Sequence, residues 1–210
     1  MDKGKRVIVT HESDCQKGVI DIFTQIEELL GCKLGGSVQY LTRYIEERRN
    51  MDGAIVEFGV YRGGSLAAMA LYMKNNNIQG GLIGLDTFCG VEGLENFSDT
   101  SVERVGSLFA AVGLEAPNLL VGEFAVTVRR LPDKIKLAFL DCDLYDSYMV
   151  ALHGCYNRMV KGGVIVLDEY YSKKYPEARK AVDQFFSDKS EKPEMYICED
   201  NGWERWCVKF

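Results

Sequence analysis

Residues 54–65, AIVEFGVYRGGS, decide the fold of this chain. The first five are apolar except for Glu57, and glycines follow at positions 59, 63 and 64. A short run rich in Val and Ile is typical of a strand that is buried on both faces, as in a parallel sheet. Glycines directly after it permit a tight turn and let a ligand approach the backbone near the start of a helix. We therefore expect a buried strand, a glycine-rich loop and a helix that begins at about Gly64.

Four more apolar runs of the same kind follow, each four or five residues long and each followed by an acid or a glycine. The five expected strands are Ala54–Phe58, Gly81–Leu85, Asn118–Val121, Lys136–Leu140 and Gly163–Leu167. Near the C-terminus, Met195–Cys198 and Arg205–Lys209 flank Asp200-Asn201-Gly202, which is typical of a hairpin. Strands that alternate with helices and end in a hairpin predict an α/β fold: an open, mostly parallel seven-stranded sheet with a C-terminal antiparallel hairpin and helices on both faces.

Helical patterns separate these runs. In Ser147–Lys161 the apolar residues recur at helical spacing, and Gly162-Gly163 is expected to end that helix. Three further helices are expected at about Lys17–Leu30, after a cap at Ser37 with Val38, Leu41 and Ile45 on one face, and from Pro176 with Ala178, Ala181, Val182 and Phe185 on one face.

Length and composition narrow the class of protein. The chain has 210 residues, 25 Lys and Arg against 31 Asp and Glu, and a net charge of −6. At roughly 150 residues per domain, we expect a single domain over 1–210, with a helical N-terminal extension at 1–50 and a core at 51–210. The acidic balance argues against nucleic acid and membrane surfaces as partners.

The cysteines and the apolar segments bear on location. Seven cysteines without a CxxC pair indicate free thiols in a reducing compartment. The N-terminal stretch MDKGKRVIVTHESD has no apolar run of signal-peptide length, and no segment approaches the roughly 18 apolar residues that a membrane span needs. We therefore expect a cytoplasmic protein.

The glycine spacing indicates the kind of cofactor. It is not GxGxxG, the pattern of dinucleotide-binding loops, because Tyr61 stands where the second glycine would fall. This disfavours a nucleotide-dependent dehydrogenase. An acid two residues before the first glycine, followed by GxxxGG, is similar to the S-adenosylmethionine (SAM) loop of Rossmann-like methyltransferases, in which the carboxylate faces the cationic end of the cofactor. A generic strand-to-helix turn is the alternative interpretation.

Acids also follow the other expected strands. Asp86 follows the second strand, where an acid can accept both ribose hydroxyls of a nucleoside, although it could equally cap a helix. Asp141 follows the fourth strand, and Asp168 and Glu169 follow the fifth. If these two strands are neighbours, the three carboxylates converge and repel one another unless they are protonated or neutralised by a cation.

Oxygen ligands of this kind suit Mg²⁺ or a similar divalent ion, which could bind a substrate hydroxyl and lower its pKa. The alternative is that the acids cap helices without a cation. For Asp143 and Asp146 capping is the favoured interpretation, because a helix start favours acids.

Together, these motifs carry a family resemblance. IVEFGVYRGGS, GLIGLDTFCGVEG, LLVGEF, LAFLDCDLYDS, KGGVIVLDEYY and ARKAVDQF occur in the order found in the macrocin O-methyltransferase-like family. The resemblance covers Ser37 to the C-terminus. It implies a class I methyltransferase fold and a SAM-dependent, metal-dependent O-methyltransferase, which acts on a hydroxyl of a sugar or other small molecule of a natural-product pathway. Association into a homo-oligomer is common in that family.

The resemblance also implies roles for individual residues. Asp141 would be the general base, and Asp141, Asp168 and Glu169 would hold Mg²⁺. The implied SAM site comprises Glu57, Gly59, Tyr61, Gly63, Ser65, Asp86, Thr87, Gly122, Glu123, Phe124 and Asp141.

Two residues depart from the family pattern. Cys142 stands where a glycine is usual, and Glu169 stands where a second aspartate is usual. They motivate an alternative function, a SAM-binding interaction module that has lost catalysis. We expect Cys142 to be a packing residue, because buried unpaired thiols are usually inert.

Other polar and aromatic residues are weaker candidates. His11 could act as a lid residue, and His153 is expected to be structural or exposed. Tyr170, Tyr171 and Trp203 could frame an acceptor, although packing is the favoured role for each.

Overall fold

The computed structural model describes residues 14–34, 38–90, 97–198 and 204–210, and these form a seven-stranded sheet of order β3-β2-β1-β4-β5-β7-β6. Strands β1 to β5 are parallel, and β7 pairs antiparallel with both β5 and β6. The strands are β1 Ala54–Phe58, β2 Leu82–Asp86, β3 Asn118–Val121, β4 Ile135–Leu140, β5 Met159–Leu167, β6 Glu194–Cys198 and β7 Glu204–Lys209. The predicted mostly parallel sheet with a C-terminal antiparallel pair is confirmed, and the expected turn at 200–202 lies outside the described residues.

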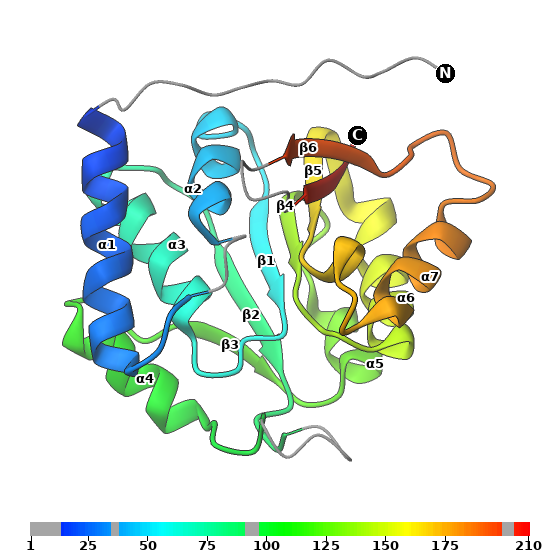
Figure 1. Cartoon of the computed structure of the whole chain (residues 1–210). Coiled ribbons are helices and arrows are strands. Elements are labelled where there is room, and N and C mark those ends of the chain that lie inside the picture. Colours follow the sequence, from blue (N-terminus) through cyan, green and yellow to red (C-terminus); the bar gives the residue numbers. More distant parts are fainter. Residues whose placement is uncertain (1–13, 35–37, 91–96, 199–203) are drawn as a thin grey trace.

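Helices cover both faces of this sheet, as Figure 1 shows, with α1 to α4 on one side and α5 to α7 on the other. The α-helices are α1 Asp14–Leu30, α2 Val38–Glu47, α3 Gly64–Asn75, α4 Val102–Ala111, α5 Phe124–Thr127, α6 Tyr145–Cys155 and α7 Pro176–Phe185. Short 3-10 helices lie at η2 Val128–Arg130, η3 Tyr156–Arg158 and η4 Glu169–Tyr171. The proposed cap at Ser37 lies outside the described residues.

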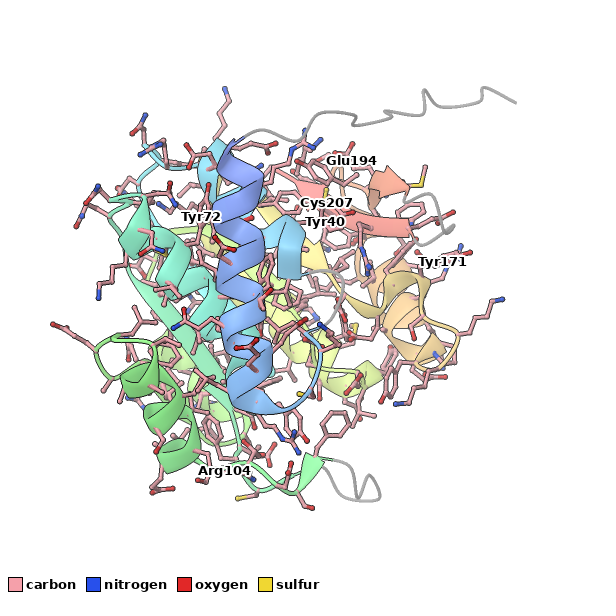
Figure 2. The ribbon with its side chains drawn as sticks, turned by 60° about the vertical axis from the view of Figure 1, so that its left-hand side comes forward. Tyr40, Tyr72, Arg104, Tyr171, Glu194 and Cys207 are labelled. Atoms are coloured by element: carbon pink, nitrogen blue, oxygen red, sulfur yellow. The ribbon has the colours of Figure 1, made fainter. Side chains whose placement is uncertain are left out.

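The core divides at the sheet into two apolar clusters, because successive side chains of a strand point to opposite faces. Ile55 of β1 packs on the side of α1 to α4, and its neighbour Val56 packs on the side of α5 to α7. Figure 2 shows α1 on the outside of the layer that α1 to α4 form, with Tyr72 of α3 and Tyr40 of α2 on either side of it in that view. Among the described residues, no helix is both long and apolar enough to cross a bilayer.

The predicted helix Ser147–Lys161 is wrong at its C-terminal end. Helix α6 ends at Cys155, and after the short η3 the chain enters β5 at Met159, which pairs with Ile135 of β4. The Gly162-Gly163 pair therefore lies inside a strand, at a shift in the β4–β5 register, where Gly162 has φ of +85°. Because Met159 pairs with β4, the helix does not continue, and the two glycines lie at an irregularity of the β4–β5 pairing instead of ending a helix.

Candidate active site

A cavity of about 510 Å³ lies beyond the carboxyl ends of β1, β2 and β4. This is the position expected for a ligand, because the strand order reverses beside β1. Eight of the residues predicted for the site line the cavity: Gly59, Tyr61, Ser65, Asp86, Thr87, Glu123, Phe124 and Asp141. Five others do not contribute to its wall: Glu57, Gly63, Gly122, Asp168 and Glu169. The last residue of α1, Leu30, and the connection after it also line the cavity, the latter through Cys32, Lys33 and Leu34, and this contribution was not predicted.

The glycine loop allows β1 and β4 to approach each other closely. Gly59 has φ of +90°, and a Cβ atom there would lie 1.8 Å from the carbonyl oxygen of Asp141. Gly63, with φ of +82°, is the N-cap residue of α3, so the helix begins at Gly64 as predicted. The first glycine is therefore required both by its backbone conformation and by the lack of space.

The Asp86 carboxylate holds this loop in place. Its Oδ2 accepts the backbone N–H groups of Val60 and Tyr61, each at 2.8 Å, and its Oδ1 accepts that of Phe88 at 2.8 Å. A carboxylate has about four acceptor positions, so about one remains for a ligand. Asp86 lines the cavity as predicted, and it also fixes the loop, which the sequence did not indicate.

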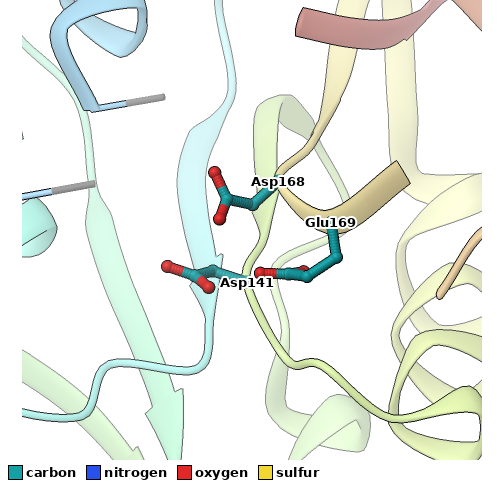
Figure 3. A group of neighbouring side chains, drawn as sticks. All are labelled: Asp141, Asp168 and Glu169. Carbon is teal, nitrogen blue, oxygen red and sulfur yellow. The ribbon is translucent and has the colours of Figure 1, made fainter. Parts of the chain in front are cut away.

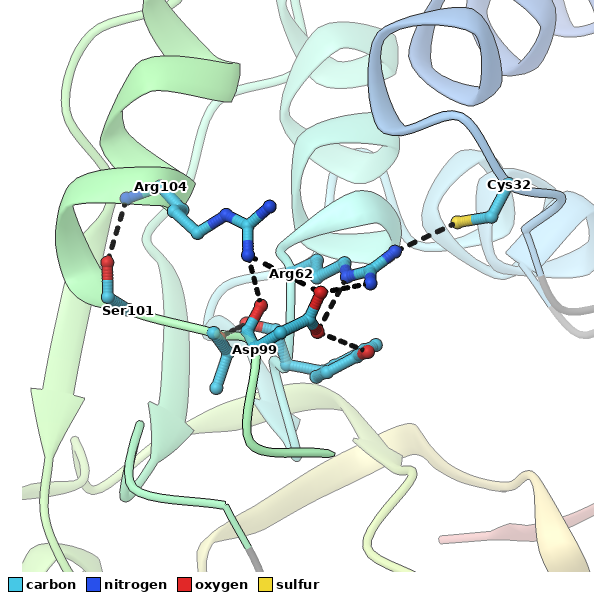
Figure 4. A network of polar contacts seen from close by, with 7 residues as sticks. Cys32, Arg62, Asp99, Ser101 and Arg104 are labelled. Atoms are coloured by element: carbon cyan, nitrogen blue, oxygen red, sulfur yellow. Dashed lines mark hydrogen bonds and ion pairs between the residues drawn. The ribbon is translucent and has the colours of Figure 1, made fainter. Parts of the chain in front are cut away.

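Asp99 ties the same loop to the segment before α4, as Figure 4 shows. It accepts hydrogen bonds from the Tyr61 hydroxyl at 2.7 Å and from Arg62, and Arg104 donates to its backbone carbonyl at 2.7 Å. The Arg62 guanidinium, followed by the Tyr61 hydroxyl, lowers the pKa of Asp99 to about 2. Tyr61 has φ of +50°, an unusual conformation for a residue with a side chain, and these contacts surround it. Sequence reasoning missed Asp99, which lies 37 residues from Arg62 in the chain.

Glu57 of β1 is fully buried and does not line the cavity, whereas its partner Ser65 does. The Ser65 hydroxyl donates to its Oε1, and its Oε2 has no hydrogen-bond partner among the described residues. Burial raises the pKa of Glu57 well above its usual value, and the Ser65 hydrogen bond opposes that rise. An unpartnered buried carboxylate oxygen is costly unless a cationic or hydrogen-bonding group reaches it.

Asp141, Asp168 and Glu169 converge where β4 and β5 end, as predicted (Figure 3). Each offers a carboxylate oxygen, and these three atoms lie within 4.8 Å of one another. Burial, followed by the charge of Asp168, raises the pKa of Asp141 well above its usual value. Burial, followed by the charge of Asp141, does the same for the pKa of Glu169.

The geometry and chemistry of this trio fit a divalent cation. Oxygen ligands around Mg²⁺ lie at about 2.1 Å from the metal, so three of them fall within about 4.2 Å of one another. The observed spacing is close to this arrangement, and a cation would remove the mutual repulsion that opposes ionisation of the three acids.

Tyr148 of α6 contacts this trio and was not predicted to be part of the site. Its side chain is fully buried, and its hydroxyl lies 2.5 Å from Oε2 of Glu169. In the sequence it is one of several apolar positions of a helical stripe, and its spacing carries no sign of a polar partner.

The capping role expected for Asp143 is wrong. Leu144 is the N-cap residue of α6, and Asp143 precedes it with φ of +57° and lines the cavity. Burial, followed by the charge of Asp168, raises the pKa of Asp143 to about 6. Asp146 lies in the first turn of α6, as expected.

The remaining candidates have the following positions. Tyr170 is buried and donates to Asp183 at 2.7 Å, which confirms its packing role. His153 is exposed, as expected, and its ring lies against that of Phe185. Tyr171 is 39% exposed and does not line the cavity, whereas Cys142 does. His11 and Trp203 lie outside the described residues.

The sheet order and the antiparallel β7 define a class I methyltransferase fold, with a cavity beyond the carboxyl ends of the parallel strands. Comparison with known families shows which methyltransferase family the chain belongs to. The model of the macrocin O-methyltransferase (TylF) family matches residues 37–202, and the chain belongs to that family. Fold and family together identify it as a SAM-dependent O-methyltransferase.

Individual relatives are distant in sequence. The demethyldecarbamoylnovobiocin O-methyltransferase of Streptomyces niveus is 24% identical over 178 residues, which are 74% of this chain and 67% of the relative. The structure of the O-methyltransferase NovP is similar with a TM-score of 0.66 and 21% identity, over 92% of this chain and 79% of the other. That of the calicheamicin methyltransferase CalS11 has a TM-score of 0.65 and 16% identity, over 100% and 99%. These structural similarities establish the fold.

Proposed function

We propose that this enzyme methylates a hydroxyl group of a sugar or sugar-like small molecule, and that a divalent cation such as Mg²⁺ assists it. The observation that carries this proposal is the convergence of Asp141, Asp168 and Glu169 beside the cavity that the glycine loop lines. The sugar is supported by the relatives, since CalS11 is described as a TDP-rhamnose 3′-O-methyltransferase.

The proposed cofactor site uses the residues around the glycine loop. SAM supplies a methyl group on a positively charged sulfur. Glu57, whose Oε2 has no partner among the described residues, would attract the cationic end of the cofactor, and Asp86 would offer its remaining acceptor position to the ribose. Gly122, Glu123 and Phe124, after β3, would lie near the adenine, while Tyr61 and Thr87 would complete the wall.

At the acceptor end, Asp141 would accept the proton of the attacking hydroxyl. A bound divalent ion, held by Asp141, Asp168 and Glu169, would lower the pKa of that hydroxyl. Catalysis would depend mainly on positioning two reactants and removing one proton. Asp143 lines the same cavity and is the natural comparison for the proposed base.

Calorimetry with S-adenosylhomocysteine (SAH) and Mn²⁺ tests both halves. We expect the wild-type protein to bind both ligands, and Asp168→Ala to bind SAH but not Mn²⁺. Failure of SAH to bind at near-millimolar protein would reject the methyltransferase. Binding of SAH without Mn²⁺ would favour the alternative of a non-catalytic SAM-binding module, which Cys142 and Glu169 motivate.

Activity assays with a panel of sugar acceptors test the proposed base. We expect Asp141→Asn to abolish methyl transfer and EDTA to inhibit it. If Asp143→Asn abolishes transfer while Asp141→Asn retains it, the base is Asp143.

We also propose a cytoplasmic enzyme. Five cysteines of the described residues are free thiols, which is usual in a reducing compartment: Cys32, Cys89, Cys142, Cys155 and Cys207.

A further inference from the structure

The Tyr148 hydroxyl makes two contacts with a single residue of the acidic trio. It lies 2.5 Å from Oε2 of Glu169, to which it donates, and it accepts the backbone N–H of Glu169 at 3.3 Å. Both residues are buried: Tyr148 is completely inaccessible to solvent, and Glu169 is 4% exposed. The hydroxyl therefore binds both the carboxylate and the main chain of the same residue, which is 21 positions away in the sequence.

The only proton of this hydroxyl is available to Glu169. A second acceptor, the carbonyl oxygen of Leu140, lies 2.9 Å from the hydroxyl. That carbonyl already accepts the backbone N–H of Asp168 at 3.1 Å, where β4 and β5 end. Donation to Glu169 therefore leaves neither acceptor without a partner. When a cation neutralises the trio and Glu169 is ionised, a hydrogen bond to its carboxylate is also stronger than one to a carbonyl.

Glu169 has a particular need for such a partner. A glutamate has one more rotatable bond than an aspartate, so its carboxylate requires more restraint to stay in one place. It lies in the three-residue helix η4, which supplies little restraint of its own. With Oε2 bound to Tyr148, Oε1 remains free of this hydrogen bond and available for a cation shared with Asp141 and Asp168.

We propose that Tyr148 is a positioning residue, which holds the Glu169 carboxylate in the orientation that completes the divalent-metal site; this inference rests on the metal part of the proposed function. Tyr148 does not contact substrate or cofactor in this role. It compensates for the greater length of a glutamate at this position, so its effect depends on Glu169.

The proposal is tested by titrating the SAH complex with Mn²⁺. Binding is measured by electron paramagnetic resonance as the loss of the signal of the free ion. We expect Tyr148→Phe to weaken Mn²⁺ binding about 10- to 100-fold, as is usual when a residue that orients a ligand is lost. Tyr156→Phe is the matched control, because Tyr156 donates to another glutamate, Glu191, at 2.7 Å outside the cavity wall. It should leave Mn²⁺ affinity within about twofold of the wild type.

The Glu169→Asp variant makes the test specific. Its carboxylate is one methylene shorter and does not reach the hydroxyl, so adding Tyr148→Phe to it should change Mn²⁺ affinity by less than about threefold. The positioning role would be overturned if Tyr148→Phe weakened Mn²⁺ binding equally in the wild-type and Glu169→Asp backgrounds. It would also be overturned if Tyr148→Phe alone left Mn²⁺ affinity unchanged.

Urea unfolding of the wild type, the two single variants and the double variant separates this inference from the function on which it rests. If the wild type binds SAH but no Mn²⁺, the metal part of the proposed function fails, and unfolding then decides the pairing. Non-additive shifts of the urea midpoint would support the restraint of Glu169 by Tyr148, and additive shifts would overturn it.

Discussion

Replacement of Gly59 by alanine tests whether the cavity depends on the close approach of β1 and β4. Gly59 has φ of +90°, and a Cβ atom would lie 1.8 Å from the carbonyl oxygen of Asp141 and 2.8 Å from its carbonyl carbon. Both atoms belong to the backbone, so the strain cannot be relieved by rotating a side chain. The end of β1 or the start of the loop after β4 must move, and that loop carries Asp141.

The expected destabilisation has two parts. A residue with a Cβ atom at positive φ costs about 1–2 kcal/mol, and inserting a methyl group into filled space costs about 1–3 kcal/mol. We therefore expect Gly59→Ala to lower the free energy of unfolding by about 2–5 kcal/mol in urea titrations. SAH affinity, measured by calorimetry, should fall as well, because Gly59 and Asp141 both line the cavity.

Gly113→Ala is the matched control for the steric part. Gly113 also has positive φ, +70°, but nothing in the described structure lies within 4 Å of the position that a Cβ atom would take there. We expect it to cost only the conformational part, about 1–2 kcal/mol, and to leave SAH affinity unchanged. If Gly59→Ala costs no more than Gly113→Ala, the close approach does not constrain the site and the reasoning is refuted.

Three further predictions concern the polar groups around the cavity. Ser65→Ala removes the hydroxyl that donates to the buried Glu57 carboxyl group, and should lower the free energy of unfolding by about 1–3 kcal/mol in urea; an unchanged value would contradict the importance of this bond. Asp99→Ala removes the carboxylate that Arg62 contacts. SAH affinity in calorimetry should fall only severalfold, because the ion pair is partly exposed. An unchanged affinity would show that Asp99 is not needed to hold the glycine loop for the cofactor. Burial raises the pKa of Asp143 from 3.8 to about 6, so the folded state binds more protons than the unfolded state between these values. In the presence of EDTA, the free energy of unfolding should therefore fall as pH rises from about 4 to 6, and Asp143→Asn should reduce that fall. If the variant and the wild type have the same dependence on pH, the raised pKa of Asp143 is refuted.

Local sequence predicted the strands well, because the parallel strands are largely buried between two layers of helices. Burial on both faces requires continuous apolar residues, and such runs can be recognised without knowledge of their neighbours. β1 and β3 have the predicted bounds, Ala54–Phe58 and Asn118–Val121. The helix after β4 was predicted too long, because Met159 suits a helical stripe and a strand equally well. Its pairing with Ile135 depends on a partner in a separate strand earlier in the chain.

The acidic trio was predictable for a related reason. Parallel strands end at the same edge of a sheet, so acids that follow two neighbouring strands must meet. Asp141, Asp168 and Glu169 could thus be brought together before their spacing was known, and their carboxylate oxygens do lie within 4.8 Å of one another.

The sequence by itself determined the fold class, the family and the acids that follow the strands, because these depend on local apolar runs and on turns that need glycine. Only the tertiary structure decided how the acids are held. The three backbone N–H groups on Asp86, the contacts of Asp99 with Tyr61 and Arg62, and the Tyr148 hydroxyl on Glu169 are such restraints. Apart from the contact of Asp86 with Phe88, they join residues between 21 and 38 positions apart in the chain. A hydrogen bond is set by distances and angles in space, and no spacing along the chain encodes contacts made between separate elements.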